Sequence, residues 1–194
     1  MTALPEELRY TVADIMEGPE DKRQELIDGI VYDMSPPSRA HQEICGELFA
    51  QLHAYLKGKK CKVYPAPFGV RLFEDPEETP GESDTLVEPD ISVVCDPSKL
   101  DKAGCKGAPD LVVEILSPST RGLDRLTKFN LYQRAGVREY WIVSPEEKAV
   151  QVFLLNGGRF DNVGYCAGLA GYSFLFACFN LRFYRLQLAQ KISR

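Results

Sequence analysis

The stretch PDLVVEIL at residues 109–116, together with EPDISVV at residues 88–94, decides how this chain folds. Each stretch is a short apolar run of the length expected for a buried strand. Each run also carries an acid where the pattern favours an apolar residue, namely Glu114 in one and Asp90 at the mouth of the other. Because an unpaired buried carboxylate is costly, such a group is normally paired, hydrogen-bonded or bound to a cation. Two apolar strands that each bring one acid to a shared place predict a divalent-metal site.

Strand geometry selects which acids can share one ion. Asp110 and Glu114 lie on the same face of a strand, but at a rise of about 3.3 Å per residue their Cα atoms are about 13 Å apart. Asp90 is therefore the better partner for Glu114, and Pro89 suits the start of a strand. We interpret Asp110 as a strand-end acid. A structural salt bridge is the alternative for Glu114, and a strand-end role is the alternative for Asp90.

The order of predicted strands and helices on either side of these two runs predicts a mixed sheet with helices packed on it. A strand–helix–strand crossover over residues 111–143 predicts a parallel strand pair with a right-handed connection. We expect the remaining strands to be antiparallel, in an α/β (α+β) fold that forms a single domain over residues 1–194. Helices are expected at residues 6–17, 41–57 and 123–135, hairpins at 25–34 and 150–166, extended chain at 62–73, an exposed loop at 74–88 and a polar connection at 96–108.

A lysine and three further side chains complete the list of candidates. Lys128 lies on the predicted helix at residues 123–135, which starts from the turn after the Glu114 strand, so its ammonium can reach the same end of the sheet. The alternative is a surface pair between Asp124 and Lys128, four residues apart. The secondary candidates are Glu25, His41 and Glu47, with Glu43 as an alternative to Glu47; each has a solvated or capping role as its alternative.

Composition limits the class of protein. The chain has 194 residues, 44% of them hydrophobic, and a formal net charge of −5, which argues against strong non-specific nucleic-acid binding. No stretch has the roughly 18 uninterrupted apolar residues of a membrane span, and residues 1–7 lack the features of a secretory signal. We therefore expect a cytoplasmic protein that does not enter a membrane. The cysteines, none of which form a Cys-x-x-Cys pair, are expected to be reduced and mostly buried.

The same residues resemble a known family. EPDISVV at 88–94, the run from Pro109 to Thr120, Lys128 with Tyr132, and GVREYWIV at 136–143 closely resemble the Uma-type restriction endonuclease family, which belongs to the PD-(D/E)xK nuclease superfamily. ELIDG at 25–29 and SPPS at 35–38 followed by His41 are also similar to that family. The resemblance extends from about residue 20 to 185, and residues 109–143 are its most specific part.

The resemblance implies a restriction-endonuclease-like core: a helix, a three-stranded antiparallel meander, a second helix and a further strand, with additional N- and C-terminal hairpins. It implies an endonuclease that hydrolyses phosphodiester bonds in DNA, with Mg²⁺ (or Mn²⁺) held by Asp90 and Glu114. One departure is visible, because the lysine expected two residues after the glutamate is Leu116. Lys128 is then the substitute, and the related folds suggest a homodimer by analogy.

Two other functions fit the same residues. The absence of a lysine at position 116 and the negative net charge favour a catalytically inactive nucleic-acid-binding or protein-interaction module on the same scaffold. A metal-free hydrolase that uses two carboxylates on a sugar is the second alternative, and it requires about 5–9.5 Å between the two acids.

Overall fold

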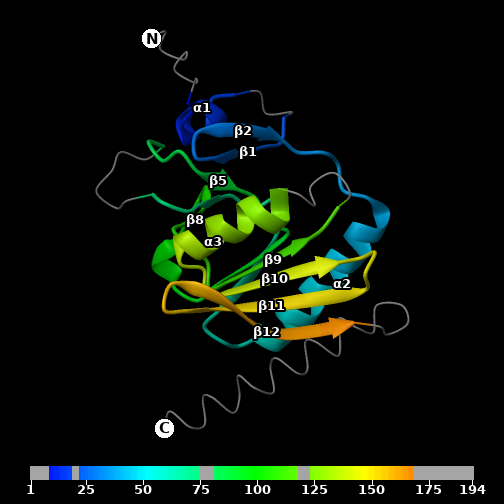
Figure 1. The fold of residues 1–194 in the computed structure, drawn as a ribbon. Helices are drawn as coiled ribbons and strands as arrows, with labels where there is room; N and C mark the ends of the chain where they lie inside the picture. Colours follow the sequence, from blue (N-terminus) through cyan, green and yellow to red (C-terminus); the bar gives the residue numbers. More distant parts are fainter. Residues whose placement is uncertain (1–8, 19–21, 75–80, 118–122, 168–194) are drawn as a thin grey trace.

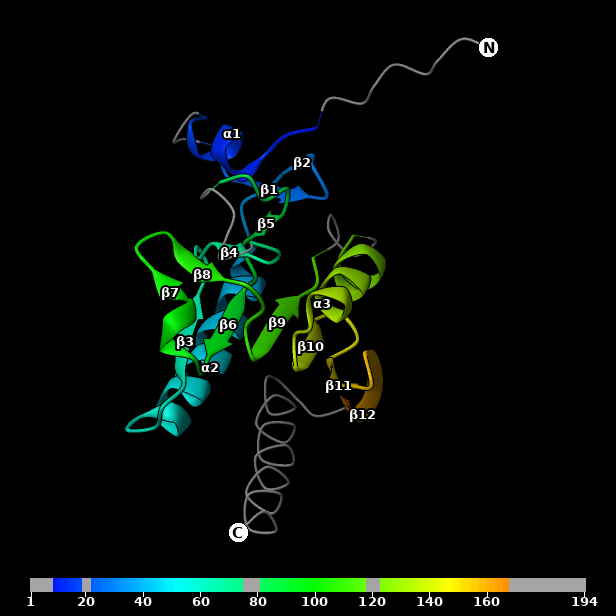
Figure 2. The same cartoon turned by 90° about the vertical axis from the view of Figure 1, so that its left-hand side faces the viewer.

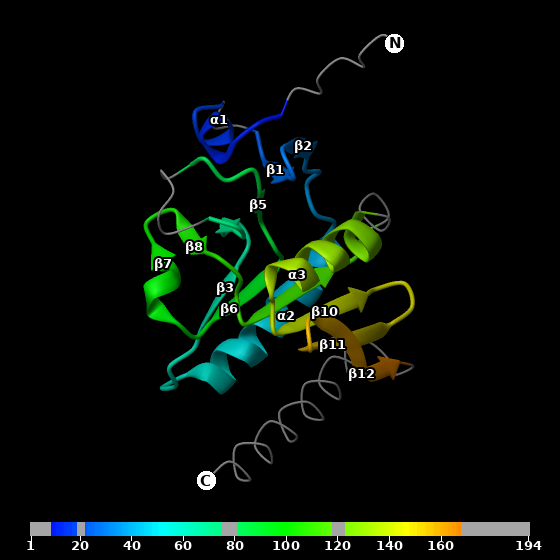
Figure 3. The same cartoon turned by 60° about the vertical axis from the view of Figure 1, so that its left-hand side comes forward.

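The computed structural model describes residues 9–18, 22–74, 81–117 and 123–167. These residues form two six-stranded sheets, ordered β2-β1-β5-β4-β8-β7 and β12-β11-β10-β9-β6-β3. The first sheet sits at one end of the second (Figure 3). The helices are α1 (Val12–Met16), α2 (Arg39–Leu56) and α3 (Phe129–Ala135), with a one-turn 3₁₀ helix at Pro97–Lys99 and a wider π-type turn at Leu123–Lys128 that leads into α3.

The second sheet is the core that the sequence predicted. Its strands are β3 (Lys62–Pro65), β6 (Ile91–Val94), β9 (Leu111–Ile115), β10 (Glu139–Ser144), β11 (Ala149–Asn156) and β12 (Arg159–Ala167). β3, β6 and β9 form an antiparallel meander, and β10 pairs in parallel with β9 after the α3 crossover. This order of α2, meander, α3 and β10 confirms the restriction-endonuclease-like mixed sheet, and the hairpin of β11 and β12 extends it.

Two apolar layers cover the two faces of this sheet. α2 packs on one face through Ile44, Leu48 and Leu52, which are spaced at helical intervals. α3 lies on the opposite face (Figures 1 and 2). Its Leu131 and Tyr132 belong to the apolar layer on that face. Side chains along a strand alternate between faces, so β9 sends Val113 and its neighbours at odd positions to α2 and those at even positions to α3. Glu114 is therefore on the α3 face.

The first sheet is built from short strands. They are β1 (Gln24–Ile27), β2 (Ile30–Asp33), β4 (Val70–Arg71), β5 (Leu86–Val87), β7 (Leu100–Asp101) and β8 (Gly104–Lys106). The predicted N-terminal hairpin is confirmed: β1 and β2 are joined by Asp28 and Gly29, which both have positive φ, as the tight Asp-Gly turn requires.

Two sequence expectations about loops were wrong. The connection at 96–108 contains the β7–β8 hairpin, and part of the loop expected to be exposed at 74–88 is the buried strand β5. The strands in these segments are only two or three residues long, which is too short for a periodic pattern to be visible. β5 and β8 each pair with β4, and β7 pairs with β8.

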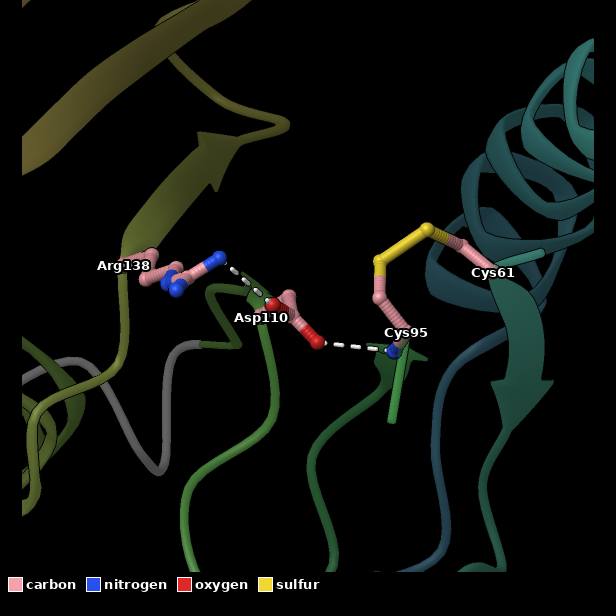
Figure 4. Close-up of a disulfide and its surroundings, with 4 residues drawn as sticks. All are labelled: Cys61, Cys95, Asp110 and Arg138. Carbon is pink, nitrogen blue, oxygen red and sulfur yellow. Dashed lines mark hydrogen bonds and ion pairs between the residues drawn. A yellow bond between two sulfur atoms is a disulfide. The ribbon is translucent and has the colours of Figure 1, made fainter. Parts of the chain in front are cut away.

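The expectation that all cysteines are reduced was also wrong. Cys61 and Cys95 form a disulfide between the segment that follows α2 and the end of β6 (Figure 4). The strand register explains their proximity: Lys62 pairs with Val94, so the residues one step beyond face each other. Cys166 is also disulfide-bonded, and Cys178 lies outside the described residues. Cys45 and Cys105 are free and buried, as expected.

No helix within the described ranges is both long and apolar enough to span a bilayer.

Candidate functional site

Strand register brings Asp90 and Glu114 together. In the β6–β9 pair Ile91 faces Val113; Asp90 immediately precedes Ile91 and Glu114 immediately follows Val113, and Asp90 Oδ2 accepts the backbone N–H of Ile115, the residue after Glu114. Directly opposed side chains in an antiparallel pair have Cβ atoms about 4.5–5.5 Å apart. Both residues line one cavity at this end of the sheet, which residues of α2 also line. Two acids in this arrangement can contact the same small ion.

The buried Lys128 contacts two acids, Glu114 and Glu25. The Lys128 ammonium is 3.0 Å from Glu114 Oε1 and 2.9 Å from Glu25 Oε2. All three residues are nearly inaccessible, with exposed fractions of 4% for Lys128, 4% for Glu114 and 3% for Glu25. Glu25 comes from β1 of the first sheet, and its Oε1 also accepts the backbone N–H of Glu88. The pairing therefore joins the two sheets at the site.

Glu114 has a second donor on the same helix. The hydroxyl of Tyr132, which is fully buried, donates to Glu114 Oε1 at 2.7 Å. Tyr132 follows Lys128 by four residues, so the two side chains project from the same side of the helix. Burial, with the negative charges of Glu114 and Glu25, raises the pKa of Tyr132 well above its ordinary value. The phenol therefore stays a hydrogen-bond donor at neutral pH.

Asp90 is held from two directions. Its Oδ2 accepts the backbone N–H of Ile115 at 2.7 Å and lies 3.2 Å from His41 Nε2 on the first turn of α2. Ser38 caps this helix by accepting the backbone N–H of His41, which fixes the imidazole at the mouth of the cavity. Within the described part of the chain, no hydrogen bond reaches the other oxygen, Oδ1. That oxygen retains its capacity as a ligand.

A free thiol lies behind Asp90. The Cys45 Sγ donates weakly to the backbone oxygen of Asp90, at 3.7 Å. Burial, and to a lesser degree the charge of Asp90, raises the pKa of Cys45 to about 11. At neutral pH the thiol is therefore neutral and adds no negative charge to the site.

Glu25, His41, Asp90, Glu114 and Lys128 line a cavity of about 240 Å³. Its rim includes the segment from Met34 to Ser38, between β2 and α2, and Arg23, which forms an ion pair with Glu88. Five carboxylates line the cavity, and the two cations that also line it, Arg23 and Lys128, leave three negative charges uncompensated; the five are Glu25, Asp33, Glu88, Asp90 and Glu114. A site of this charge attracts cations and repels a phosphodiester unless a cation is present.

The donor set fits a hard divalent cation. The described residues contain no cluster of three or more His, Cys, Asp or Glu side chains arranged to hold a metal ion. Mg²⁺ does not require one, because it is commonly bound through one or two carboxylates and completes its octahedron with water and substrate phosphate. Asp90 and Glu114 would be those carboxylates, and Asp90 Oδ1 has the free capacity that this role needs.

The candidates Glu47 and Glu43 lie elsewhere, and so does Asp110, which the sequence indicated as a strand-end acid. Glu47 is exposed on α2, where its carboxylate accepts a hydrogen bond from Gln51, and Glu43 is exposed and pairs with Arg39. Neither lines the cavity. Asp110 is at the opposite end of β9, where it binds the Cys95 backbone N–H and Arg138 (Figure 4).

Sequence reasoning did not single out Tyr132 as part of this site. The available signal was its spacing, because a tyrosine four residues after a candidate lysine lies on the same side of a helix. Helical spacing could not distinguish a tyrosine that only packs in the core from one whose hydroxyl also contacts a carboxylate.

Comparisons with known proteins agree with this architecture. Residues 10–173 match the model of the Uma2 family, which is described as "Putative restriction endonuclease". A Synechocystis protein named "Uncharacterized protein slr1290" is 29% identical over 136 residues, which cover 70% of this chain and 67% of that protein. A crystal structure from Anabaena variabilis, described as "a putative nuclease belonging to DUF820", superposes with a TM-score of 0.63 at 18% identity. It covers 86% of this chain and 92% of that one. At this identity the structural match establishes the fold alone.

Proposed function

The chain belongs to the Uma2 family, and from this premise we propose that it is a Mg²⁺-dependent endonuclease that hydrolyses phosphodiester bonds in DNA, with Mn²⁺ as an alternative ion. The observation that carries the proposal is that Asp90 and Glu114, at adjoining ends of β6 and β9, line one cavity beside the buried Lys128. The nuclease-like fold and the family support a nuclease role in general. The ion and the DNA substrate belong to our proposal.

In this proposal each residue has a separate task. Asp90 and Glu114 are the metal ligands, and Mg²⁺ when bound supplies Lewis-acid activation of the phosphodiester and the attacking water. Lys128 places a compact positive charge next to Glu114, where it can stabilise negative charge that develops on the phosphate. Glu25 holds the Lys128 ammonium in place, and His41 orients Asp90 through Oδ2.

The position of Lys128 compensates for Leu116. A lysine two residues after Glu114 would be placed by the strand itself, whereas Leu116 is buried among apolar side chains of the α3 layer. Lys128 reaches the same carboxylate from the helix side, at 3.0 Å. The charge is thus supplied by a different element at the same acid.

The test is cleavage of plasmid DNA with Mg²⁺ and with Mn²⁺. We expect Asp90→Asn, Glu114→Gln and Lys128→Met each to lower the rate by about 10²-fold or more, as removal of a transition-state contact does. Glu47→Gln is the matched control, because Glu47 is an exposed acid outside the cavity. Unchanged rates in all three site variants, or full activity in EDTA, would refute the proposal.

Leu116 also supports a second candidate, a catalytically inactive nucleic-acid-binding or interaction module. Titration calorimetry separates the two: the module predicts binding of DNA without cleavage and without a heat of Mg²⁺ binding. We further propose one domain over residues 1–194, a cytoplasmic location and, by analogy with related folds, a homodimer. Light scattering tests the last point, because a dimer has twice the chain mass of 21.8 kDa.

A further inference from the structure

A buried phenol lies where an apolar ring would pack equally well. The Tyr132 ring packs on Tyr140, with ring centroids 5.1 Å apart, inside the apolar layer between α3 and the sheet. A buried hydroxyl costs about 1–3 kcal/mol unless it finds a partner. Within the described residues, Glu114 Oε1 is the hydrogen-bond partner of this hydroxyl. Packing in the core requires only the ring, so the hydrogen bond to Glu114 is the reason for a hydroxyl at this position.

Tyr132 and Lys128 act on one oxygen of the same carboxylate. Their donor atoms lie 2.7 Å and 3.0 Å from Glu114 Oε1. Two donors from successive turns of one helix fix both the position of this oxygen and the rotation of the carboxylate. The carboxylate is thereby oriented in advance on the side of the cavity that it shares with Asp90.

A hydroxyl performs this task without adding charge. A second ammonium at this position would neutralise one of the site's uncompensated negative charges and repel an incoming cation. A phenol instead orients the carboxylate and stabilises its charged form by hydrogen bonding. Burial and the nearby carboxylates keep the pKa of Tyr132 well above its ordinary value, so the phenol keeps its proton at neutral pH.

We propose that Tyr132 is a positioning residue that holds the Glu114 carboxylate for cation binding. The proposal rests on the proposed function, because it assigns Glu114 to the same metal site. It separates two roles on one helix: Lys128 supplies charge, and Tyr132 supplies orientation.

The experiment measures Mn²⁺ binding by calorimetry across pH for the full chain and for Tyr132→Phe. We expect the Kd for Mn²⁺ to rise about tenfold, because a hydrogen bond to a charged group is lost while the ring is retained. The pH midpoint of binding should move to higher pH, since the carboxylate has lost a donor that favours its charged form. In DNA cleavage, high Mn²⁺ should restore the rate of Tyr132→Phe but not that of Glu114→Gln.

The control is Tyr140→Phe, which removes one hydroxyl from a tyrosine of equal burial in the same apolar layer. Its Mn²⁺ affinity and pH midpoint should equal those of the wild type. Thermal unfolding of both variants confirms that each is folded, and a general loss of packing would lower the melting temperature without moving the pH midpoint.

The outcomes distinguish the two levels of the proposal. Wild-type protein that binds Mn²⁺, with a Tyr132→Phe variant of equal affinity and equal pH midpoint, overturns the role of Tyr132 and leaves the proposed function intact. Wild-type protein that binds no Mn²⁺ and cleaves no DNA overturns the proposed function and this role with it.

Discussion

At the scale of single residues, one ammonium determines whether the candidate site is stable. Lys128 is the buried partner of both Glu25 and Glu114, and these contacts lie in a region that water barely reaches. Breaking a buried ion pair by removing one partner is strongly destabilising, because the remaining charge stays buried. Lys128 is thus a structural counter-ion in the absence of metal as well as a candidate for catalysis.

We expect Lys128→Met to lower the free energy of unfolding at pH 7 by about 3–5 kcal/mol, because two buried carboxylates lose their cation. The deficit should shrink on addition of Mg²⁺, which replaces the lost positive charge. Urea unfolding with and without Mg²⁺ measures this effect. Lys62→Met, at an exposed lysine on β3, should change stability by less than about 0.5 kcal/mol. Equal stability of the two variants would contradict the counter-ion role.

The buried thiols predict a loss of stability at alkaline pH. Burial raises the pKa of Cys45 and of Cys105 from 9.0 to about 11. A raised pKa in the folded state means that the contribution to stability is fully present below pH 9 and is lost as the pH rises through about 11. Urea unfolding from pH 8 to 11 should show this decline, and a Cys45→Ala, Cys105→Ala double variant should show a smaller one. A decline of equal size in both proteins would count against the thiols as its source.

At the scale of elements, α3 is held on the sheet by the N-terminal hairpin. Glu25 of β1 binds Lys128, and Asp28 of the β1–β2 turn pairs with Arg134 near the end of α3. The Asp28–Arg134 pair is largely exposed and worth at most about 1 kcal/mol. The buried contact therefore contributes more to positioning α3, and an element outside the nuclease-like core contributes a residue to the site.

The segment from α2 to β3 is fixed at both ends. Its first turn carries His41, which contacts Asp90, and the disulfide of Cys61 closes the far end. β3 then returns along β6 to the site, where the backbone N–H of Ala66 binds the backbone oxygen of Asp90. Asp90 is thus located by contacts from α2 and from the residue that follows β3, while the disulfide links the α2–β3 connection to the end of β6.

A Cys61→Ser, Cys95→Ser double variant should lose about 3–4 kcal/mol of stability under non-reducing conditions, the chain-entropy value for a separation of 34 residues. Denaturant unfolding measures the difference. Mass spectrometry of a non-reduced digest should find the two cysteines in one cross-linked pair of peptides. Alkylation of both cysteines without prior reduction would show that the bond is absent.

At the scale of the whole molecule, the described residues of the two sheets are joined through a polar site. The first sheet supplies Glu25 and the second supplies Glu114, and the Glu88 backbone next to Asp90 binds Glu25. A contact network that joins two sheets through buried charges favours cooperative unfolding, because neither sheet can leave without exposing an unpaired charge.

We therefore expect one unfolding transition for the full chain, in line with the proposed single domain. Trp141 is the only tryptophan and lies in the α2 layer of the second sheet, so its fluorescence reports on that sheet. Far-UV circular dichroism reports on both sheets. The two curves in urea should coincide. Separate midpoints would indicate that the sheets unfold independently.

Most of the second sheet could be predicted from the sequence. The apolar run around Val113 and the helical spacing of Ile44, Leu48 and Leu52 indicate buried surfaces. Gly136, which has a positive φ, marks the end of α3. Strands of two or three residues such as β5 and β8 could not be predicted, because they leave no periodicity and depend on partners distant in sequence.

The sequence by itself determined that acids lie within or next to apolar strands. An acid in an apolar run can be recognised without knowing which strand lies beside it. It also determined the helix that carries Lys128. Only the tertiary structure decided that Glu25, which is 103 residues from Lys128, binds its ammonium, that Tyr132 contacts Glu114, and that Glu47 faces solvent. The physical reason is that periodicity records which side of an element is buried, whereas contacts between side chains depend on how separate elements are placed against one another.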